Sequence, residues 1–306
     1  KDLSSISLLD YRKSSDVSGT SGAGRIAVLY AFGDIVDGNT SGDEQIGGES
    51  LSRELRKLRE DDKIKAIVLR VNSPGGSALA SDLIWREVSL AKKAKPVIVS
   101  MGDYAASGGY YISAAADSIF ADAGTLTGSI GVFGLIPNLQ NLFNNKLGLH
   151  FDVVKTGPYA DVSVDRPLTA EERTIVQGGV NRIYQQFMQR VADGRGLSIA
   201  QVDSIGQGRV WTGSQAIELG LVDRLGTLDD AVKSAAKMAK LDLYKISEYP
   251  RTKDPFESIF SSSKEKVKMW FLEDELGEHV RYVKDLKRVM QNTGIQARVP
   301  YEIEIY

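Results

Sequence analysis

The sequence contains no cysteine, and its only histidines are His150 and His279. Without thiols there is no disulfide framework, no cysteine nucleophile and no cysteine-based zinc site. The absence of cysteine is compatible with an oxidising or a reducing compartment. A Ser-His-Asp triad would have only these two histidines to choose from as its base. The missing residue types therefore restrict the chemistry of any hydrolytic site, and we expect neither a metal nor a cofactor.

The sequence also lacks a strong charge of either sign. Its 38 basic residues are nearly balanced by 40 acidic ones, which gives a net charge of -2. The protein therefore lacks the positive electrostatic field that binds a nucleic-acid backbone. No apolar run approaches the roughly 18 residues of a membrane span. The first residue is Lys1, and neither a start methionine nor a signal-peptide pattern is present. We therefore expect a fragment of a longer chain, with any membrane anchor upstream of Lys1.

Hydrophobic residues make up 42% and charged residues 25% of the 306 positions, which is typical of globular proteins. Residues 1–24 have the Ser- and Gly-rich composition of a linker or leader, and a folded domain is expected over residues 25–248. From about residue 249 onward aromatic and charged stretches alternate without strand signals, which predicts a helical C-terminal extension over residues 249–306. Its apolar stripe at residues 256–271 is expected to pack against another subunit or the parent domain, with an interfacial membrane helix as the less favoured alternative.

Within the predicted domain, β-type apolar runs alternate with helical patterns. This alternation favours right-handed crossovers and an α/β fold with a mostly parallel sheet flanked by helices. A Thr169 capping box marks the start of the longest predicted helix. Strands are expected at residues 26–30, 66–71, 96–100, 118–121 and 151–155, and helices at 49–60, 77–91, 139–147, 169–192, 198–205, 214–220 and 228–240.

Two strand-to-helix turns are unusually rich in small residues. The first is SPGGS at residues 73–77, where adjacent glycines let the backbone approach a ligand. The second is GDYAASGGY at residues 102–110, which is similar to a nucleophile elbow with Ser107 at its apex, although Ala105 stands where that pattern has glycine. Both turns follow neighbouring predicted strands, at the edge where open α/β sheets place their sites.

Together with TLTGSIGV at residues 125–132 and GRVWTG at residues 208–213, these turns resemble the signal peptide peptidase A family. Its members are Ser-Lys proteases with a Clp/crotonase-type fold of repeated ββα units. The similarity spans roughly residues 25–239, in order and at family-like spacing. The chain looks like the C-terminal half of the long, tandem-repeat form of the family.

The resemblance implies a role for each matching position. Ser107 matches the nucleophile, the backbone N–H groups of Gly75 and Gly108 match the oxyanion donors, and Ser129 matches the hydroxyl that orients the lysine base. The substrates implied are cleaved signal peptides and other apolar peptides. We expect the cleft that receives them to be lined by Leu126, Thr127, Ile130, Val132 and Phe133.

The lysine base is missing from the matching position, which is Ala160 here. Nearby Lys155 matches a different, non-catalytic lysine of the family. In the long form the base comes from the N-terminal repeat, so the resemblance implies that the isolated chain is inactive or nearly so. It also implies a homo-oligomer, a tetramer of full-length chains, held at the bacterial inner membrane by an upstream anchor with its catalytic part on the periplasmic side.

Two alternatives stay open at this point. The chain could be a non-catalytic half that only assembles the oligomer, although such a scaffold has no need of the combined Ser107, Gly75, Gly108 and Ser129 set. It could also be a self-contained Ser-His-Asp hydrolase, which requires His150 within hydrogen-bond reach of Ser107.

Overall fold

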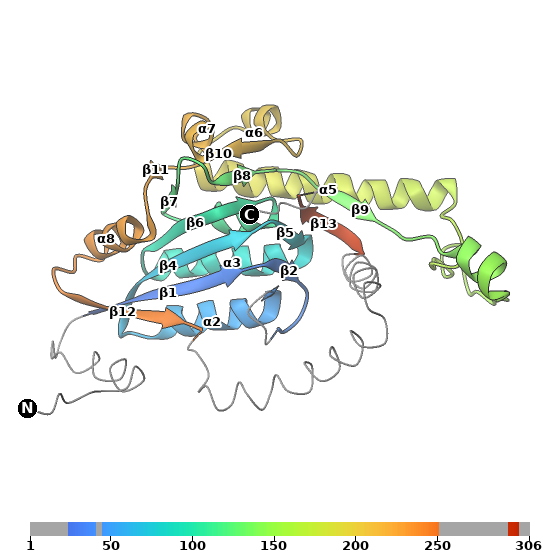
Figure 1. The fold of residues 1–306 in the computed structure, drawn as a ribbon, viewed down its shortest axis with the longest axis horizontal. Helices are drawn as coiled ribbons and strands as arrows, with labels where there is room; N and C mark the ends of the chain where they lie inside the picture. Colours follow the sequence, from blue (N-terminus) through green and yellow to red (C-terminus); the bar gives the residue numbers. More distant parts are fainter. Residues whose placement is uncertain (1–23, 41–44, 251–292, 300–306) are drawn as a thin grey trace, which may run out of the picture.

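The computed structural model describes residues 24–40, 45–250 and 293–299. At its centre is a mostly parallel sheet with the strand order β10-β8-β6-β4-β1-β12, and β7 and β11 extend it beside β6 (Figure 1). The predicted α/β fold with a mostly parallel sheet is therefore confirmed. The strands of this sheet are β1 (Gly24–Phe32), β4 (Ile64–Ser73), β6 (Val97–Ala106), β7 (Ser118–Ala121), β8 (Leu126–Gly128), β10 (Val210–Thr212), β11 (Arg224–Leu225) and β12 (Tyr244–Tyr249).

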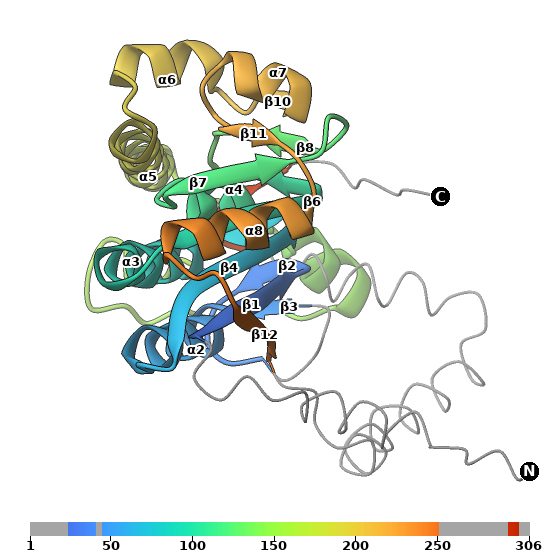
Figure 2. The same cartoon turned by 90° about the vertical axis from the view of Figure 1, so that its left-hand side faces the viewer.

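Helices cover both faces of the sheet (Figure 2). Because side chains alternate along a strand, Ala27 and Leu29 of β1 enter one buried cluster while Ile26 and Val28 enter another. This burial on both faces explains why the strands appear in the sequence as continuous apolar runs. The larger cluster includes side chains from α2 (Gly48–Glu60) and α3 (Ala78–Ala94), and the smaller one includes side chains from α8 (Leu228–Met238).

A second, smaller sheet lies at the carboxyl edge of the first, with the order β3-β2-β5-β13-β9. The sequence did not predict this second sheet. Its last strand in chain order, β13, also corrects one prediction. Residues 293–299 belong to the extension that was expected to be helical, yet they contain a strand that pairs with β5 and β9. The strands are β2 (Asp34–Val36), β3 (Gln45–Gly47), β5 (Gly75–Ser77), β9 (Phe133–Leu135) and β13 (Gly294–Arg298).

The apolar stripe at residues 256–271 and His279 lie outside the described residues. Among the helices that the structure describes, none combines the length and the apolar character needed to cross a membrane.

An arm projects from the body between β9 and the long helix α5 (Ala170–Arg195) (Figure 1). It contains η2 (Leu142–Leu147), a π-helix in the region where an ordinary helix was expected. The predicted strand at residues 151–155 is wrong, because this segment is irregular and fully on the surface. Its apolar residues suit a pleated, half-buried position, but the described part of the chain supplies no partner strand for them.

The helix starts follow their sequence signals closely. Thr169 caps α5 with a complete capping box, as predicted, and three later helices begin with the same device. Their caps are Ser198, Thr212 and Thr227, which precede α6 (Ile199–Ile205), α7 (Gly213–Glu218) and α8.

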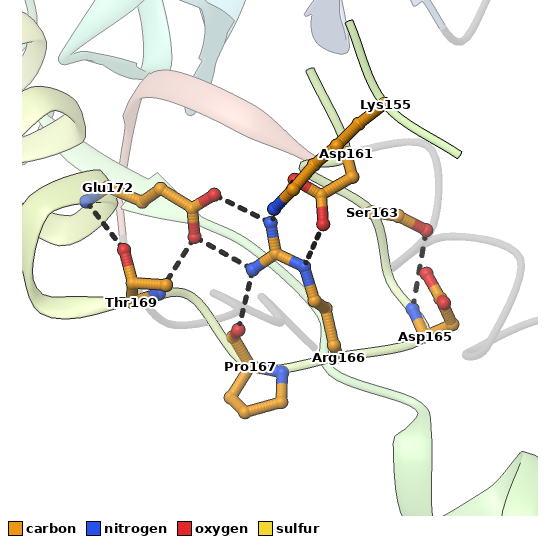
Figure 3. A network of polar contacts seen from close by, with 8 residues as sticks. All are labelled: Lys155, Asp161, Ser163, Asp165, Arg166, Pro167, Thr169 and Glu172. Atoms are coloured by element: carbon orange, nitrogen blue, oxygen red, sulfur yellow. Dashed lines mark hydrogen bonds and ion pairs between the residues drawn. The ribbon is translucent and has the colours of Figure 1, made fainter. Parts of the chain in front are cut away.

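An ion-pair network centred on the buried Glu172 carboxylate connects the arm to the start of α5 (Figure 3). The Arg166 guanidinium donates to both carboxylate oxygens of Glu172, at 2.6 and 2.8 Å, and to Asp161 at 3.1 Å. Glu172 also accepts from the backbone N–H of Thr169 at 2.8 Å, and Lys155 lies 3.3 Å from Asp161. The Glu172 carboxylate thus completes the capping box of α5 and also binds Arg166 of the arm.

This arrangement predicts an acid-sensitive contribution to stability. The hydrogen bonds from Arg166, followed by that from Thr169, lower the pKa of Glu172 from 4.5 to about 2. Because the folded-state pKa lies below the unfolded one, the stabilisation is complete above pH 4.5 and is lost as the pH falls toward 2. We expect the melting temperature of the wild type to fall more steeply between pH 4.5 and 2 than that of Glu172→Gln. Glu171→Gln, at the neighbouring exposed position, is the matched control, and parallel curves for wild type and Glu172→Gln would contradict the expectation.

Candidate active site

Ser107 stands on a left-handed turn between β6 and the short helix α4 (Gly108–Ser113). Its φ of 52° is a conformation that side-chain-bearing residues rarely adopt, and it costs on the order of 1–3 kcal/mol. The turn is held by a 2.8 Å hydrogen bond from the Ser107 backbone N–H to the Gly128 carbonyl. Ser107 is fully buried, and its Oγ donates to the carbonyl of Gly131 at 3.3 Å. The serine is therefore held in one orientation at the edge of the sheet.

Gly75 and Gly108 meet backbone to backbone beside this turn. A Cβ on Gly108 would come 3.0 Å from the Cα of Gly75 and 2.7 Å from the Oγ of Ser81, so neither alanine nor any larger residue fits there without a shift. Gly75 has a φ of 99°, which also favours glycine. Its N–H donates to the Oγ of Ser73 at 3.2 Å.

The pairing of the strands explains why these two turns meet. β4 and β6 are adjacent and parallel, and their register shifts after Val71 so that Ser73 lies opposite Ala105. The carboxyl ends of both strands therefore reach the same edge of the sheet, as expected from the sequence.

Strand pairing also places Ser129 beside Ser107. β6 and β8 run parallel with Ala106 opposite Gly128, so each serine is the next residue after a paired position. Ser129 is buried, has a φ of 47°, and donates its N–H to the Arg209 carbonyl at 2.7 Å. Two serines on left-handed turns thus stand side by side at the end of the sheet.

The residues expected to line a cleft fall into two groups. Leu126, Val132 and Phe133 are half-buried and retain accessible surface. Thr127 is buried with its hydroxyl donating to a β6 carbonyl at 2.7 Å, and Ile130 is enclosed in the main core. Neither Thr127 nor Ile130 presents its side chain to a cleft in this structure.

Among the described residues, none of the candidate bases is hydrogen-bonded to Ser107. Lys155 pairs with Asp161 on the arm, where 47% of its side chain is exposed, and His150 is also exposed on the arm. Ala160 carries no base and lies in an exposed turn. Within the described residues, the hydrogen-bond partner of the Ser107 Oγ is a backbone carbonyl and not a basic side chain. The described part of the chain also contains no group of three acidic or histidine side chains placed to hold a metal ion.

Sequence reasoning missed one neighbour of the glycine pair. The carbonyl oxygen of Ala297, in β13, would lie 2.9 Å from a Cβ on Gly108 and would clash with a Cβ on Gly75. The available signal was the alternation of Ile295 and Ala297 with polar residues after Gly294.

The parallel sheet, its covering helices and the serine turn form an α/β unit with a candidate nucleophile at the carboxyl edge of the sheet. The family model of Clp protease matches residues 35–121, which include both glycine-rich turns. Among solved structures, a ClpP1 variant from Listeria monocytogenes covers 67% of this chain and 94% of its own length, with a TM-score of 0.45 and 18% identity.

The model of peptidase family S49 matches residues 89–242, about half of the chain. A putative protease of Synechocystis sp. is 43% identical over 200 residues, and the match covers 65% of this chain and 72% of the relative. The chain therefore belongs to peptidase family S49. Protease 4 of Salmonella typhi is 46% identical over 80% of the chain, and Protease 4 of Haemophilus influenzae is 47% identical over 70%. The chain spans only 39% and 35% of these two relatives.

Proposed function

We propose that this chain supplies the nucleophile and the oxyanion hole of a serine peptidase. The observation that carries the proposal is the close approach of Gly75 and Gly108 beside the strained Ser107 turn. The names of the relatives support it, since they include Protease 4 and a serine protease of Arabidopsis thaliana. A non-catalytic half that only assembled the oligomer would not need a buried serine on an unfavourable turn next to two backbone N–H donors.

In the proposed reaction, the Ser107 Oγ bonds to the carbonyl carbon of a peptide and gives its proton to a base. The carbonyl oxygen becomes negative in the tetrahedral intermediate and accepts from the N–H groups of Gly75 and Gly108. The C–N bond then breaks, the amine leaves with the proton, and an acyl-enzyme remains for water to hydrolyse. The present bond from Gly75 to the Ser73 hydroxyl is no obstacle, because a charged oxygen is the stronger acceptor.

The base is proposed to be a lysine of an N-terminal repeat, oriented by Ser129. To accept a proton, that lysine must be neutral, so its pKa must fall from about 10.4 to near 7. A buried, dry site achieves this by desolvation, and Ser107 and Ser129 are both buried. The described environment therefore suits a lysine that arrives from outside the chain.

Cleaved signal peptides and other apolar peptides are the proposed substrates. A putative signal peptide peptidase of Enterococcus faecium is 36% identical to the chain, which covers 70% of that relative. The half-buried Leu126, Val132 and Phe133 supply apolar surface near the serine turn. The proposed location is the periplasmic side of the bacterial inner membrane, with attachment through an upstream anchor.

Labelling with a serine-directed fluorophosphonate tests the shared site. We expect Ser107 to react about 100-fold faster when the lysine-bearing repeat is added than when the chain is alone, since general-base catalysis contributes on this scale. Equal rates in both cases would contradict the proposal. So would labelling of the isolated chain that is lost on Lys155→Ala, because the base would then be local.

The arm is proposed to be a contact surface in a homo-oligomer. Phe151, Val153 and Val154 are more than half exposed and form an apolar strip on the arm, where the Phe151 ring packs edge-to-face against Phe143 with a centroid distance of 5.2 Å. A strip of this kind is costly in water and typical of an interface. The resemblance to the tandem-repeat peptidases favours a tetramer of full-length chains.

Introducing charge into this apolar strip should therefore weaken assembly of the oligomer. We expect the double variant Phe151→Asp and Val154→Asp to lower the oligomer mass of the full-length protein, measured by light scattering, because burying two carboxylates is unfavourable. Leu243→Asp, at an equally exposed apolar site away from the arm, is the matched control and should leave the mass unchanged. An unchanged mass in the double variant would exclude the strip from the interface.

A further inference from the structure

Strand β5 carries the proposed oxyanion donor Gly75, and two of its three residues are glycines that restrict their own backbone little. Neighbouring groups must therefore fix the direction of the Gly75 N–H. Gly76 is fixed by close packing, because a Cβ there would overlap the carbonyl oxygen of Ile35 in β2. The third residue, Ser77, is fixed through its side chain.

Ser77 is buried at the point where β5 ends and α3 begins, and it makes three hydrogen bonds that involve a side chain. Its hydroxyl donates to the Asp37 carboxylate at 2.5 Å and accepts from the Ala80 N–H at 3.2 Å, as the N-cap of α3. Its carbonyl accepts from the Ser81 hydroxyl at 2.8 Å. Because a carboxylate only accepts hydrogen bonds, Asp37 fixes the direction of the Ser77 O–H and leaves the oxygen free to accept from Ala80.

The pairing of β2 with β5 places Asp37 beside Ser77. The two strands run parallel with Ile35 opposite Gly76, so Ser77 and Asp37 follow the paired position by one and two residues. The loop that carries Asp37 is anchored to the start of α2, since the Glu49 N–H donates to the Gly38 carbonyl at 3.0 Å. Asp37 itself is exposed, so its contact reaches the buried end of β5 from the surface.

The same contacts extend to the second proposed donor, Gly108. Ser81 is fully buried, and its Oγ would lie only 2.7 Å from a Cβ on Gly108. The hydrogen bond to the Ser77 carbonyl keeps the Ser81 hydroxyl in this place. The three side chains of Asp37, Ser77 and Ser81 thus form one connected support beside both donors. An oxyanion hole depends on such support, because its donors act only when they are held in place before the charge develops.

We infer that Asp37 and Ser77 are positioning residues for the oxyanion hole, which hold β5 directly and the start of α4 through Ser81. The inference rests on the proposed function, because it concerns donors that act in peptide hydrolysis. The negative charge on the substrate oxygen exists only in the transition state and the tetrahedral intermediate. Loss of the Asp37–Ser77 contact should therefore lower kcat and leave KM nearly unchanged.

The kinetics of the full-length protein with a fluorogenic apolar peptide test this assignment. We expect Asp37→Ala and Ser77→Ala each to lower kcat by about 10- to 100-fold, with KM changed by less than about threefold. Asp37→Asn keeps an oxygen acceptor and should lose less than Asp37→Ala. The double variant should lose no more than the weaker single variant, because both substitutions remove one contact. Ser89→Ala is the matched control in the same helix, since its Oγ donates to the Trp85 carbonyl at 2.9 Å, and it should stay within about threefold of the wild type.

A peptide aldehyde distinguishes misplaced donors from a loss of folded enzyme. The Ser107 Oγ bonds to the aldehyde carbon, its proton passes to the base, and the former carbonyl oxygen becomes the anion that the donors bind. In each variant the Ki of the aldehyde should rise by the same factor as kcat/KM falls. The Ki of the matching peptide alcohol, which cannot form this adduct, should stay constant. A smaller folded fraction would lower kcat without changing either Ki.

The outcomes separate the inference from the proposed function. An unchanged kcat in both Asp37→Ala and Ser77→Ala would overturn the inference alone, and so would a lower kcat with an unchanged Ki for the aldehyde. An equal loss in Ser89→Ala would also overturn it, because any change in α3 would then suffice. A wild-type protein that the aldehyde does not inhibit would instead overturn the proposed function, and the inference with it.

Discussion

Replacing Ser107 by alanine is expected to lower kcat/KM by about 10⁴-fold or more when the lysine-bearing repeat is present. The variant retains the glycine pair and the cleft, so peptide binding should survive while the acyl-enzyme can no longer form. The measurement is hydrolysis of a fluorogenic apolar peptide by the reconstituted enzyme. Fluorophosphonate labelling of the same sample should disappear.

Ser113→Ala provides the matched control for this loss. Ser113 is also a buried serine, on the helix that follows Ser107, and its Oγ donates to the Gly109 carbonyl at 2.7 Å. Its removal costs one hydrogen bond, about 1 kcal/mol of stability, and should leave activity within about threefold of the wild type. If Ser107→Ala kept a tenth of the activity, or if Ser113→Ala lost as much, Ser107 would not be the nucleophile.

The second large effect is expected at Gly194, near the end of α5. A Cβ at this position would overlap the carbonyl oxygen of Ala114, which ends helix α4, and backbone cannot rotate away as a side chain can. We expect Gly194→Ala to reduce the free energy of unfolding by about 3 kcal/mol, as other overpacked contacts do. Urea denaturation followed by circular dichroism measures this change.

Gly178→Ala in the same helix is the comparison. Apart from the neighbouring backbone of its own helix, no atom lies within 4 Å of a Cβ at Gly178, so the substitution relieves only the entropic cost of glycine in a helix. It should raise the free energy of unfolding by about 0.5–1 kcal/mol. Similar effects of the two substitutions would show that α5 does not press on the end of α4. That contact links the arm-bearing helix to the helix that starts at Ser107.

The sequence was informative where one local rule decides the structure. Residues 66–69 are continuously apolar because this part of β4 is buried on both faces, and the pattern can be recognised from the sequence alone. The Thr169 capping box is likewise complete within four residues. The meeting of Gly75 with Gly108 was also within reach, because it follows from two adjacent parallel strands and needs no side-chain detail.

The sequence was misleading where pairing with a distant segment decides the structure. The Gly-Gly-Ser of β5 is typical of a turn, and it becomes a strand only because β2 and β13 lie on either side of it. Residues 151–155 show the opposite error, since their β-prone side chains have no partner strand among the described residues. Strand propensity describes a position on a sheet and cannot say whether a neighbouring strand exists.

The pairing of β1 with β12 also sets an order of events during synthesis. β1 is the first strand of the main sheet to be made, yet the partner on its outer side begins at Tyr244. The hydrogen bond from Tyr30 to Glu248 joins residues 218 positions apart. Until residue 249 has left the ribosome, the outer edge of β1 has no native partner and can recruit a strand from another chain. Such a long-range closure slows folding, so this edge stays open to aggregation until β12 has been made.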